Sequence, residues 1–263
     1  MDINLTGRRA VVCGSTQGIG RAAAIELAEL GAAVVLVARD ERALRAAEAE
    51  LPAPAEQRHG FAVADFTDPA QVRSAAERIA RGGGGTVHIL VNNTGGPPGG
   101  PIADAAPEAF EQAFRMHLVN NQILAQALLP GMKEAGFGRI INIISTSVKA
   151  PIPGLGVSNT IRAAVASWAK TLAGEVAPFG ITVNNVLPGY TDTARLQSLF
   201  EARAERSKST ADDEREQTRA AIPAGRIGRP EEIAAAIAFL ATPAAAYING
   251  VNLPVDGGRL PTL

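Results

Sequence analysis

Small and polar residues that could hold a phosphate group stand near the start of the chain. The sequence Cys13-Gly14-Ser15-Thr16-Gln17-Gly18-Ile19-Gly20 lies between a short β-rich run, 9–13, and a helical pattern, 19–30. Glycines in such a turn let backbone N–H groups and the helix N-terminus approach a pyrophosphate. The expected phosphate-binding residues are Gly14, Ser15, Thr16, Gln17, Gly18, Ile19 and Gly20.

Further polar motifs follow later β-rich runs. In chain order they are Asp65, Asn92-Asn93-Thr94-Gly95, Ser145 and Pro188-Gly189. Taken singly, Asp65 would suit a helix cap and the paired asparagines a turn. The motifs are far more specific together and in this order than any one of them alone.

The elements that must position these residues alternate regularly along the chain. Seven β-rich runs lie at 9–13, 33–38, 60–64, 87–91, 139–144, 182–186 and 251–255. Helical patterns lie between them at 19–30, 41–51, 69–80, 107–135, 155–177 and 230–240. Several runs are apolar on successive residues, which suits strands covered by helices on both faces. The pattern predicts an α/β fold, a single-domain doubly wound (Rossmann) seven-stranded parallel sheet.

Composition narrows the classes of protein. A chain of 263 residues with 46% hydrophobic content can bury one sizeable core, so a single domain, 1–263, is expected. A net charge of -1 without a basic stripe argues against nucleic acid as a partner. The single cysteine, Cys13, cannot form an internal disulfide, and no apolar run approaches a membrane span. We expect a cytoplasmic protein that acts on a small molecule, with neither a membrane partner nor a metal.

Along its whole length the chain resembles the short-chain dehydrogenase/reductase family, in particular the 3-oxoacyl-ACP reductases. Pro230-Glu231-Glu232 and Asp256-Gly257-Gly258 extend the match to the C-terminal region. The resemblance implies an oxidoreductase that moves a hydride between nicotinamide and a carbonyl/alcohol pair or an activated C=C bond. Beyond the phosphate turn, the cofactor-binding residues it implies are Arg39, Asp65, Phe66, Asn92, Thr94, Gly95, Arg162, Pro188, Gly189, Thr191 and Thr193.

The end of the second run bears on the choice of cofactor. Arg39 stands where an acidic residue would accept hydrogen bonds from a ribose 2′-hydroxyl, and a guanidinium suits a 2′-phosphate. The resemblance likewise associates arginine here with NADP(H), so NADP(H) is favoured over NAD(H). The alternatives are that Asp40 accepts the 2′-hydroxyl of NAD, or that Arg39 is an ordinary surface residue.

The resemblance breaks at the catalytic residues. In the family a serine is followed thirteen residues later by a tyrosine and four further on by a lysine; here the three positions hold Ser145, Ser158 and Arg162. No shift of the alignment restores the pair, because Tyr190 and Tyr247 are the only tyrosines and neither has a lysine four residues later. The position of the family's asparagine holds His117.

These changes affect proton transfer to the substrate oxygen more than hydride transfer from the nicotinamide. A serine hydroxyl is a much poorer acid than a phenol, whereas an arginine keeps its charge and can still hold ribose hydroxyls. Losing general acid–base help costs roughly 10²–10⁴ in rate. Ser145 is expected to donate to the substrate oxygen, although a serine at a strand end is often only a cap.

Three other side chains are candidates for restoring the proton path: Tyr190, His117 and Lys149. The structural alternatives are a pocket wall for Tyr190, a hydrogen-bonded buried histidine for His117 and a solvated charge for Lys149.

The sequence also supports expectations for two segments, 95–101 and 192–220, and for the oligomeric state. The Gly/Pro-rich segment 95–101 follows a strand end, where open α/β sheets bind ligands, so it is either part of the site or a plain loop. The charged segment 192–220 is expected to cap the substrate side, or else to be a solvated helix pair. By resemblance, 107–135 and 155–177 would build a homodimer and the last strand a homotetramer.

Two other functions remain open. A catalytically impaired nucleotide-binding sensor or partner protein would keep the fold while losing the chemistry. A lyase-like function is suggested by halohydrin dehalogenases, which also carry arginine at the lysine position. Those enzymes retain the tyrosine and lack a working dinucleotide loop, which is the reverse of this chain.

Overall fold

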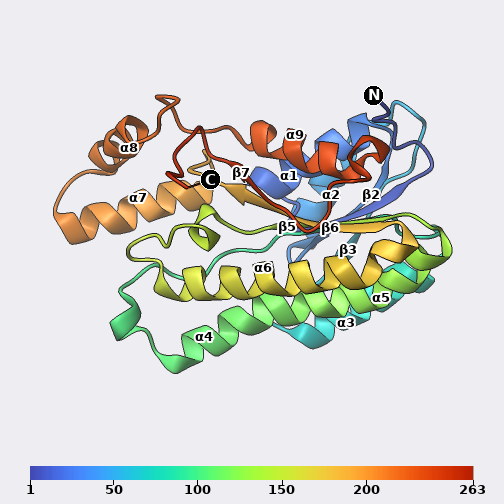
Figure 1. Ribbon diagram of the computed structural model, residues 1–263, viewed down its shortest axis with the longest axis horizontal. Coiled ribbons are helices and arrows are strands. Elements are labelled where there is room, and N and C mark those ends of the chain that lie inside the picture. Colours follow the sequence, from blue (N-terminus) through green and yellow to red (C-terminus); the bar gives the residue numbers. More distant parts are fainter. Residues whose placement is uncertain (263) are drawn as a thin grey trace.

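The central sheet of the protein is parallel throughout. The computed structural model describes residues 1–262 and orders seven strands as β3-β2-β1-β4-β5-β6-β7 (Figure 1). The strands are β1 Arg9–Cys13, β2 Ala33–Ala38, β3 Gly60–Val63, β4 Ile89–Asn92, β5 Gly138–Ile143, β6 Ile181–Pro188 and β7 Asn252–Val255. The order reverses between β1 and β4, which is the switch point where such sheets bind ligands. The predicted doubly wound sheet is confirmed.

Helices cover both faces of the sheet. They are α1 Gly18–Glu29, α2 Glu41–Ala49, α3 Pro69–Arg81, α4 Pro107–Phe114, α5 Asn120–Glu134, α6 Gly156–Val176, α7 Ala194–Ser207, α8 Ala211–Ala220 and α9 Pro230–Ala241. Short 3₁₀ turns occupy Ile102–Asp104, Thr146–Val148, Ala177–Phe179 and Pro243–Ala245. Figure 1 shows α1 and α9 on one side of the sheet and α3, α5 and α6 on the other, with α7 and α8 at one end.

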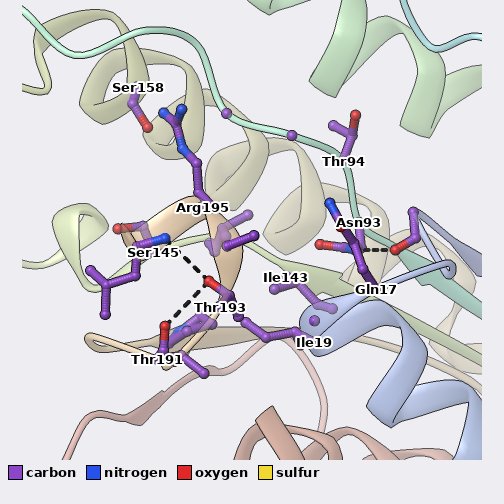
Figure 2. Close-up of a pocket in the computed structure, with 18 of the residues that line it drawn as sticks. Gln17, Ile19, Asn93, Thr94, Ile143, Ser145, Ser158, Thr191, Thr193 and Arg195 are labelled. Carbon is purple, nitrogen blue, oxygen red and sulfur yellow. Dashed lines mark hydrogen bonds between the residues drawn. The ribbon is translucent and has the colours of Figure 1, made fainter. Parts of the chain in front are cut away.

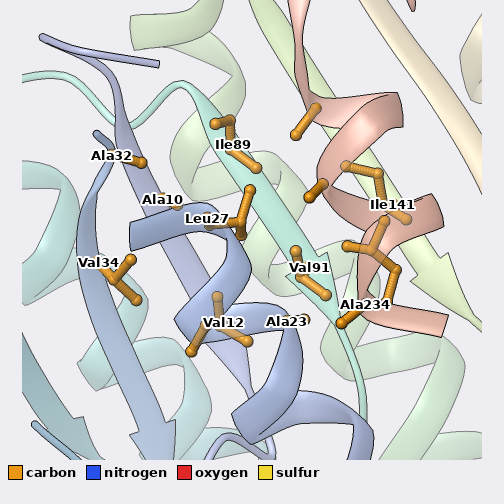
Figure 3. Packing of buried hydrophobic residues seen from close by; sticks show 14 of the residues in the cluster. Ala10, Val12, Ala23, Leu27, Ala32, Val34, Ile89, Val91, Ile141 and Ala234 are labelled. Atoms are coloured by element: carbon orange, nitrogen blue, oxygen red, sulfur yellow. The ribbon is translucent and has the colours of Figure 1, made fainter. Parts of the chain in front are cut away.

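Two apolar layers hold the helices against the sheet. Val12 of β1 packs with Leu27 of α1 and Ile237 of α9, as part of the layer drawn in Figure 3. Its neighbour Val11 points to the opposite face, where it packs with side chains of α3, α5 and α6. Successive strand residues are therefore buried on opposite faces, which explains the unbroken apolar runs in the sequence. Each fully buried Leu or Ile contributes about 1.5–3 kcal/mol relative to an exposed one.

The predicted helix 107–135 is interrupted, which corrects the sequence expectation. α4 ends at Phe114, a π-helical turn occupies Arg115–Val119, and α5 begins at Asn120. The Asn120 side chain donates from Nδ2 to the Phe66 carbonyl at 2.8 Å and to the Met116 carbonyl at 3.2 Å. The backbone stays right-handed helical on both sides of the π turn, at Phe114 and Asn120, so the sequence reads as a single helix.

A row of asparagine side chains, three of them buried, crosses four strands at one register position. Asn92 Nδ2 donates to Asn142 Oδ1 at 2.8 Å, Asn142 Nδ2 donates to Asn185 Oδ1 at 2.9 Å, and Asn185 Nδ2 donates to Asn252 Oδ1 at 2.8 Å. The same residues are backbone partners in the pairings of β4, β5, β6 and β7. We call these four residues the asparagine ladder. Its hydrogen bonds satisfy most of the polar atoms that burial would otherwise penalise, although Asn92 Oδ1 has no hydrogen-bond partner among residues 1–262.

The charged segment 192–220 forms two helices. Thr193 caps the start of α7, accepting a hydrogen bond from the Leu196 amide at 3.3 Å. α8 begins with a capping box between Thr210 and Asp213, and the two helices pack against each other. Only the beginning of α7 contributes to the cleft described below.

Candidate active site

A cleft of about 500 Å³ opens at the carboxyl edge of the sheet. This volume lies within the range of small-molecule sites, which is about 300–1,000 Å³. Residues at or after the ends of all seven strands line it, from Gly14 after β1 to Arg259 after β7. Figure 2 shows Gln17 and Ile19 at one end of the cleft and Ser145, Ser158 and Arg195 toward the other. The phosphate turn and the altered catalytic positions therefore share one cavity.

The phosphate turn has the shape that a pyrophosphate requires. Gly14 and Gly18 adopt positive φ angles of 57° and 54°, and a Cβ on Gly14 would lie 2.7 Å from Asn93 Nδ2. Asn93 Nδ2 donates to the carbonyls of Cys13 and Gly14 at 3.3 and 3.2 Å, which fixes the turn. Gln17 precedes α1 without a side-chain cap, so the first N–H groups of the helix remain available to an anion.

The turn residues divide into two groups. Gly14, Thr16, Gln17, Gly18 and Ile19 line the cleft. Ser15 is fully buried, and its Oγ accepts a hydrogen bond from the Val37 amide at 3.0 Å. A Cβ on Gly20 would collide with the Gly14 carbonyl, so Gly20 allows the close approach of helix and turn. The structure places Ser15 and Gly20 behind the turn and outside the lining of the cleft.

Arg39, Asp65 and Phe66 line the end of the cleft beside β2 and β3. Asp65 Oδ1 accepts hydrogen bonds from both the amide and the hydroxyl of Thr67 at 2.8 Å. These bonds, and to a lesser extent the Arg39 charge, lower the pKa of the Asp65 carboxyl. Asp40 Oδ1 accepts from the Ala43 amide at 3.0 Å as the cap of α2, and Asp40 does not line the cleft.

Ser145, Ser158 and Arg162 all line the cleft at its other end. Ser145 Oγ accepts from the Ser147 amide at 3.1 Å, which leaves its hydroxyl hydrogen free to donate. Arg162 Nη1 donates to the Ile143 carbonyl at 2.7 Å, at the end of β5. Burial, together with the positive charge of Arg195, lowers the pKa of Arg162 to about 10. The guanidinium therefore stays charged at neutral pH.

His117 lies within the π turn and is 4% exposed, behind the cleft rather than in its lining. Burial, and then the Arg162 charge, lowers the pKa of His117 to about 2, against a weaker opposite effect of a hydrogen bond at the Gly95 backbone. Its Nε2 has no hydrogen-bond partner among residues 1–262. The imidazole is therefore neutral at working pH and cannot act there as a cationic acid.

The end of β6 and the segment after it form another wall of the cleft. Pro188, Gly189, Tyr190, Thr191 and Thr193 line the cleft. Tyr190 Oη accepts a hydrogen bond from Arg203 Nη2 at 3.2 Å, and the Arg259 guanidinium lies 4.7 Å from the ring centroid. Both contacts fix the ring as part of the wall.

Besides Ser15, Gly20 and His117, two more residues singled out from the sequence lie outside the cleft lining. Asn92 does not line the cleft; it is buried and belongs to the asparagine ladder, while Thr94 and Gly95 do line the cleft. Lys149 is also absent from the lining.

Sequence reasoning missed Arg195, Arg259, Leu155 and Leu199, which all line the cleft. The signal for Arg195 was its position two residues after Thr193, in a segment already assigned to the cofactor. The other three carry no comparable signal, since a lone leucine or arginine is ordinary in any chain.

The described residues also bear on three other kinds of feature: a reactive cysteine, a metal site and a membrane-spanning helix. Burial raises the pKa of the Cys13 thiol to about 12, so this thiol is unreactive at neutral pH. Within residues 1–262, no cluster of three or more His, Cys, Asp or Glu side chains is placed to bind a metal ion. No helix in the same range has the length and apolar character that a membrane crossing requires.

Known proteins match both the sequence and the fold. A family model described as enoyl-(acyl carrier protein) reductase matches residues 14–259. The 3-oxoacyl-(acyl-carrier-protein) reductase FabG of Vibrio cholerae is 37% identical over 258 residues, which covers 97% of this chain and 98% of that protein. The chain belongs to the short-chain dehydrogenase/reductase family.

Solved structures agree with this assignment. L-sorbose reductase from Gluconobacter frateurii, in complex with NADPH and L-sorbose, superposes with a TM-score of 0.92 at 32% identity and covers all of both chains. A short-chain oxidoreductase from Pseudomonas aeruginosa PAO1, described as NADPH-bound and as containing an atypical catalytic center, has a TM-score of 0.86 at 32% identity over 99% of both chains. This short-chain dehydrogenase/reductase is therefore an oxidoreductase with a nicotinamide cofactor.

Proposed function

We propose that the protein is an NADP(H)-dependent oxidoreductase of carbonyl/alcohol substrates that works with Ser145, Ser158 and Arg162 in place of the usual serine, tyrosine and lysine. The observation that carries the proposal is that the phosphate turn and these three side chains open into the same cleft. A dinucleotide bound at the turn would extend its nicotinamide toward the residues that follow β5 and β6, as the family resemblance implies.

The cleft fits the cofactor. The uncapped start of α1 and the glycines of the turn would hold the pyrophosphate, and the Asp65–Phe66 segment would border the adenine. Thr191 and Thr193 would face the nicotinamide end, with Arg162 at the nicotinamide ribose. The bound cofactor supplies or accepts the hydride.

The preference for NADP(H) rests on Arg39. Its side chain lines the cleft, whereas Asp40 caps α2 and is turned to the Ala43 amide. A guanidinium can pair with a 2′-phosphate in bidentate fashion, and an already engaged carboxylate is a poor acceptor for a 2′-hydroxyl. The NADPH found in the Gluconobacter and Pseudomonas structures supports the same choice.

The chain's own residues handle the oxygen of the substrate. Ser145 and Ser158 hydroxyls donate to the carbonyl oxygen, and the Arg162 charge stabilises the negative charge that develops there as the carbon accepts a hydride. The proton that completes the alcohol comes from water through the serine hydroxyls. His117 is excluded as a cationic donor because it is neutral. Tyr190 serves as a wall that keeps the substrate in place.

A fluorescence titration with NADPH and NADH tests the cofactor assignment. We expect NADPH to bind about tenfold or more tightly than NADH, because an arginine–phosphate pair is a charge-assisted interaction. Arg39→Ala should remove this preference, whereas Arg42→Ala, on the exposed side of α2, should keep it. An equal affinity of the wild type for both nucleotides would overturn the NADP(H) assignment.

Turnover tests the chemistry. NADPH oxidation is measured across ketones, oxoacyl thioesters and enones, with Ser145→Ala and the double variant Ser158→Tyr with Arg162→Lys. We expect Ser145→Ala to lose about 10²-fold or more in kcat, as for other oxyanion donors. The double variant should lose native turnover if the altered pair is part of the mechanism. Saturable NADPH binding with no oxidation of any substrate would favour the sensor function instead.

A further inference from the structure

The Gly/Pro-rich segment 95–101 faces a pair of cationic side chains. A Cβ built on Gly96 would lie 3.6 Å from Arg162 Nη2 and 3.6 Å from Arg195 Nη2. The two guanidinium groups come from different elements, α6 and α7, and converge on one point of the cleft wall. Figure 2 shows the Arg195 side chain extending from the Thr193 segment into the cleft.

Neither guanidinium has an anionic partner in residues 1–262. Arg195 Nη2 donates to the Pro97 carbonyl at 2.6 Å, and Arg162 Nη1 donates to the Ile143 carbonyl at 2.7 Å. Neither takes part in a salt bridge of the described chain, whose eight ion pairs involve other arginines. Two cations therefore lie close together with only neutral carbonyls bonded to them. Like charges in a partly desolvated site repel, and a bound anion would relieve that repulsion.

The same segment is apolar a few residues further on. A Cβ on Gly99 would lie 3.4 Å from Leu155 Cδ2 and 3.9 Å from Leu199 Cδ2, and both leucines line the cleft. Segment 95–101 thus borders two guanidinium groups at Gly96 and two leucine side chains at Gly99. This arrangement matches a short molecule with an anionic group next to an aliphatic part.

We propose that Arg195, with Arg162 beside it, binds a carboxylate of the substrate, so that this oxidoreductase acts on short oxo acids and hydroxy acids. Leu155 and Leu199 contact the aliphatic part. The carboxylate itself is unchanged: the carbonyl carbon accepts the hydride, its oxygen accepts the proton, and the reverse reaction returns both. The identity of the substrate class rests on the proposed function, whereas the binding of a carboxylate at Arg195 can be tested without turnover.

The cofactor is the other source of an anion in this cleft. A Cβ on Gly18 would lie 3.2 Å from Thr193 Cγ2, so the start of α7 also approaches the phosphate turn. Arg195 leans away from that turn, toward Pro97 and the Gly96 wall, which favours the substrate as the source of the anion. The experiment must therefore measure nucleotide binding and carboxylate binding separately.

Short-chain α-, β- and γ-oxo acids are compared with their methyl esters as substrates of wild type, Arg195→Met and Arg206→Met. Arg206→Met is the control, because Arg206 is exposed and lies on α7 like Arg195. We expect the best acid to exceed its ester in kcat/KM by about tenfold to hundredfold, the range of a charge-assisted hydrogen bond. Arg195→Met should remove this preference, mainly through KM. Its NADPH Kd should stay within about twofold of wild type, because in this proposal the Arg195 charge pairs with the substrate and not with the cofactor.

Calorimetry with butyrate, added to the complex with NADPH, tests the carboxylate site without chemistry. Butyrate should bind to wild type and Arg206→Met and should bind at least about tenfold more weakly to Arg195→Met. Equal reactivity of acids and esters, or equal butyrate binding by wild type and Arg195→Met, would overturn the proposal. So would an Arg195→Met variant that loses NADPH affinity while keeping its preference for acids. If no carbonyl compound is turned over but butyrate binding depends on Arg195, the carboxylate site stands and the redox function fails.

Discussion

Two arginines at opposite ends of β5 differ in how completely the protein satisfies them. Arg139 is the second residue of the strand, is 2% exposed and donates to the carbonyls of Gly138, Gly180 and Thr242 at 2.8, 3.2 and 3.3 Å. Its guanidinium also lies 4.1 Å from the Phe137 ring centroid. Arg162 donates to Ile143 near the end of the same strand and points its other nitrogen into the cleft beside Arg195.

The difference separates a structural cation from a functional one. A guanidinium carries five N–H donors, and burial penalises each donor that lacks an acceptor. Three carbonyls accept from Arg139 and meet most of this demand, so it links the end of α9, the start of β6 and the start of β5. The demand is only partly met for Arg162 and Arg195, so their remaining donors are available to a ligand. The predictions for Arg139 and Arg162 test this distinction, and those for His117 and Glu232 extend it to a buried imidazole and an exposed carboxyl. They are given in order of decreasing effect.

Arg139→Met should give the largest loss of stability. It removes a charged donor from three carbonyls, of which the Gly180 carbonyl keeps its bond from the Gly138 amide, and we expect a cost on the order of 3 kcal/mol in the free energy of unfolding. Urea denaturation measures the change. Arg8→Met is the matched control: the Arg8 guanidinium lies 4.0 Å from the centroid of the same Phe137 ring, and its loss should cost under about 1 kcal/mol. NADPH affinity should not change in either variant, and a changed affinity in Arg139→Met would break the distinction.

His117 should make stability fall with acid. Its folded pKa of about 2 lies below the unfolded value of about 6.5, so below pH 6.5 the unfolded chain binds the proton that the folded chain excludes. The free energy of unfolding should drop by up to about 1.4 kcal/mol per pH unit, or about 2 kcal/mol by pH 5.

His117→Asn should have a flatter pH profile, and the other histidines cancel when the two profiles are subtracted. Parallel profiles from pH 7 to pH 5 would show that His117 is protonated in the folded protein.

Arg162→Met should affect the ligand more than the fold. We expect NADPH to bind about tenfold more weakly, because a charge-assisted bond to the ribose is lost. The free energy of unfolding should change by less than about 1 kcal/mol, since removing one of two neighbouring cations relieves repulsion with Arg195. Fluorescence titration and urea denaturation on the same samples measure both. A large loss of stability with unchanged NADPH affinity would place Arg162 in the same class as Arg139.

Glu232→Gln should have the smallest effect. Glu232 accepts from the Arg229 amide at the start of α9 and from Arg226, and these bonds lower its pKa to about 2. A carboxyl with a lowered pKa stabilises the fold above its unfolded pKa and loses that contribution as pH falls toward 2. Because the ion pair is exposed, we expect under about 1 kcal/mol at pH 7, measured by thermal denaturation. A larger loss of stability would indicate that this N-terminal cap is needed for the packing of α9 against the sheet.

Short sequence motifs predicted those parts of the site that a few consecutive residues form. The turn after β1 and the arginine after β2 follow from glycine spacing and from the end of an apolar run, as at Gly14 and Arg39. The pairing of Arg195 with Arg162 could not be predicted, because it depends on α7 folding back over segment 95–101. The neutrality of His117 depends on its burial within a π turn, which the packing of the whole fold determines and no local motif marks.

The asparagine ladder joins the last strand of the sheet to the phosphate turn. Asn252 bonds to Asn185, Asn185 to Asn142 and Asn142 to Asn92, and the next residue, Asn93, holds the carbonyls of Cys13 and Gly14. A one-residue slip of any of these strands would break its ladder bonds and turn its apolar side chains to the wrong face. During synthesis, the turn made from the first twenty residues would thus gain its full support only after Asn252 has left the ribosome.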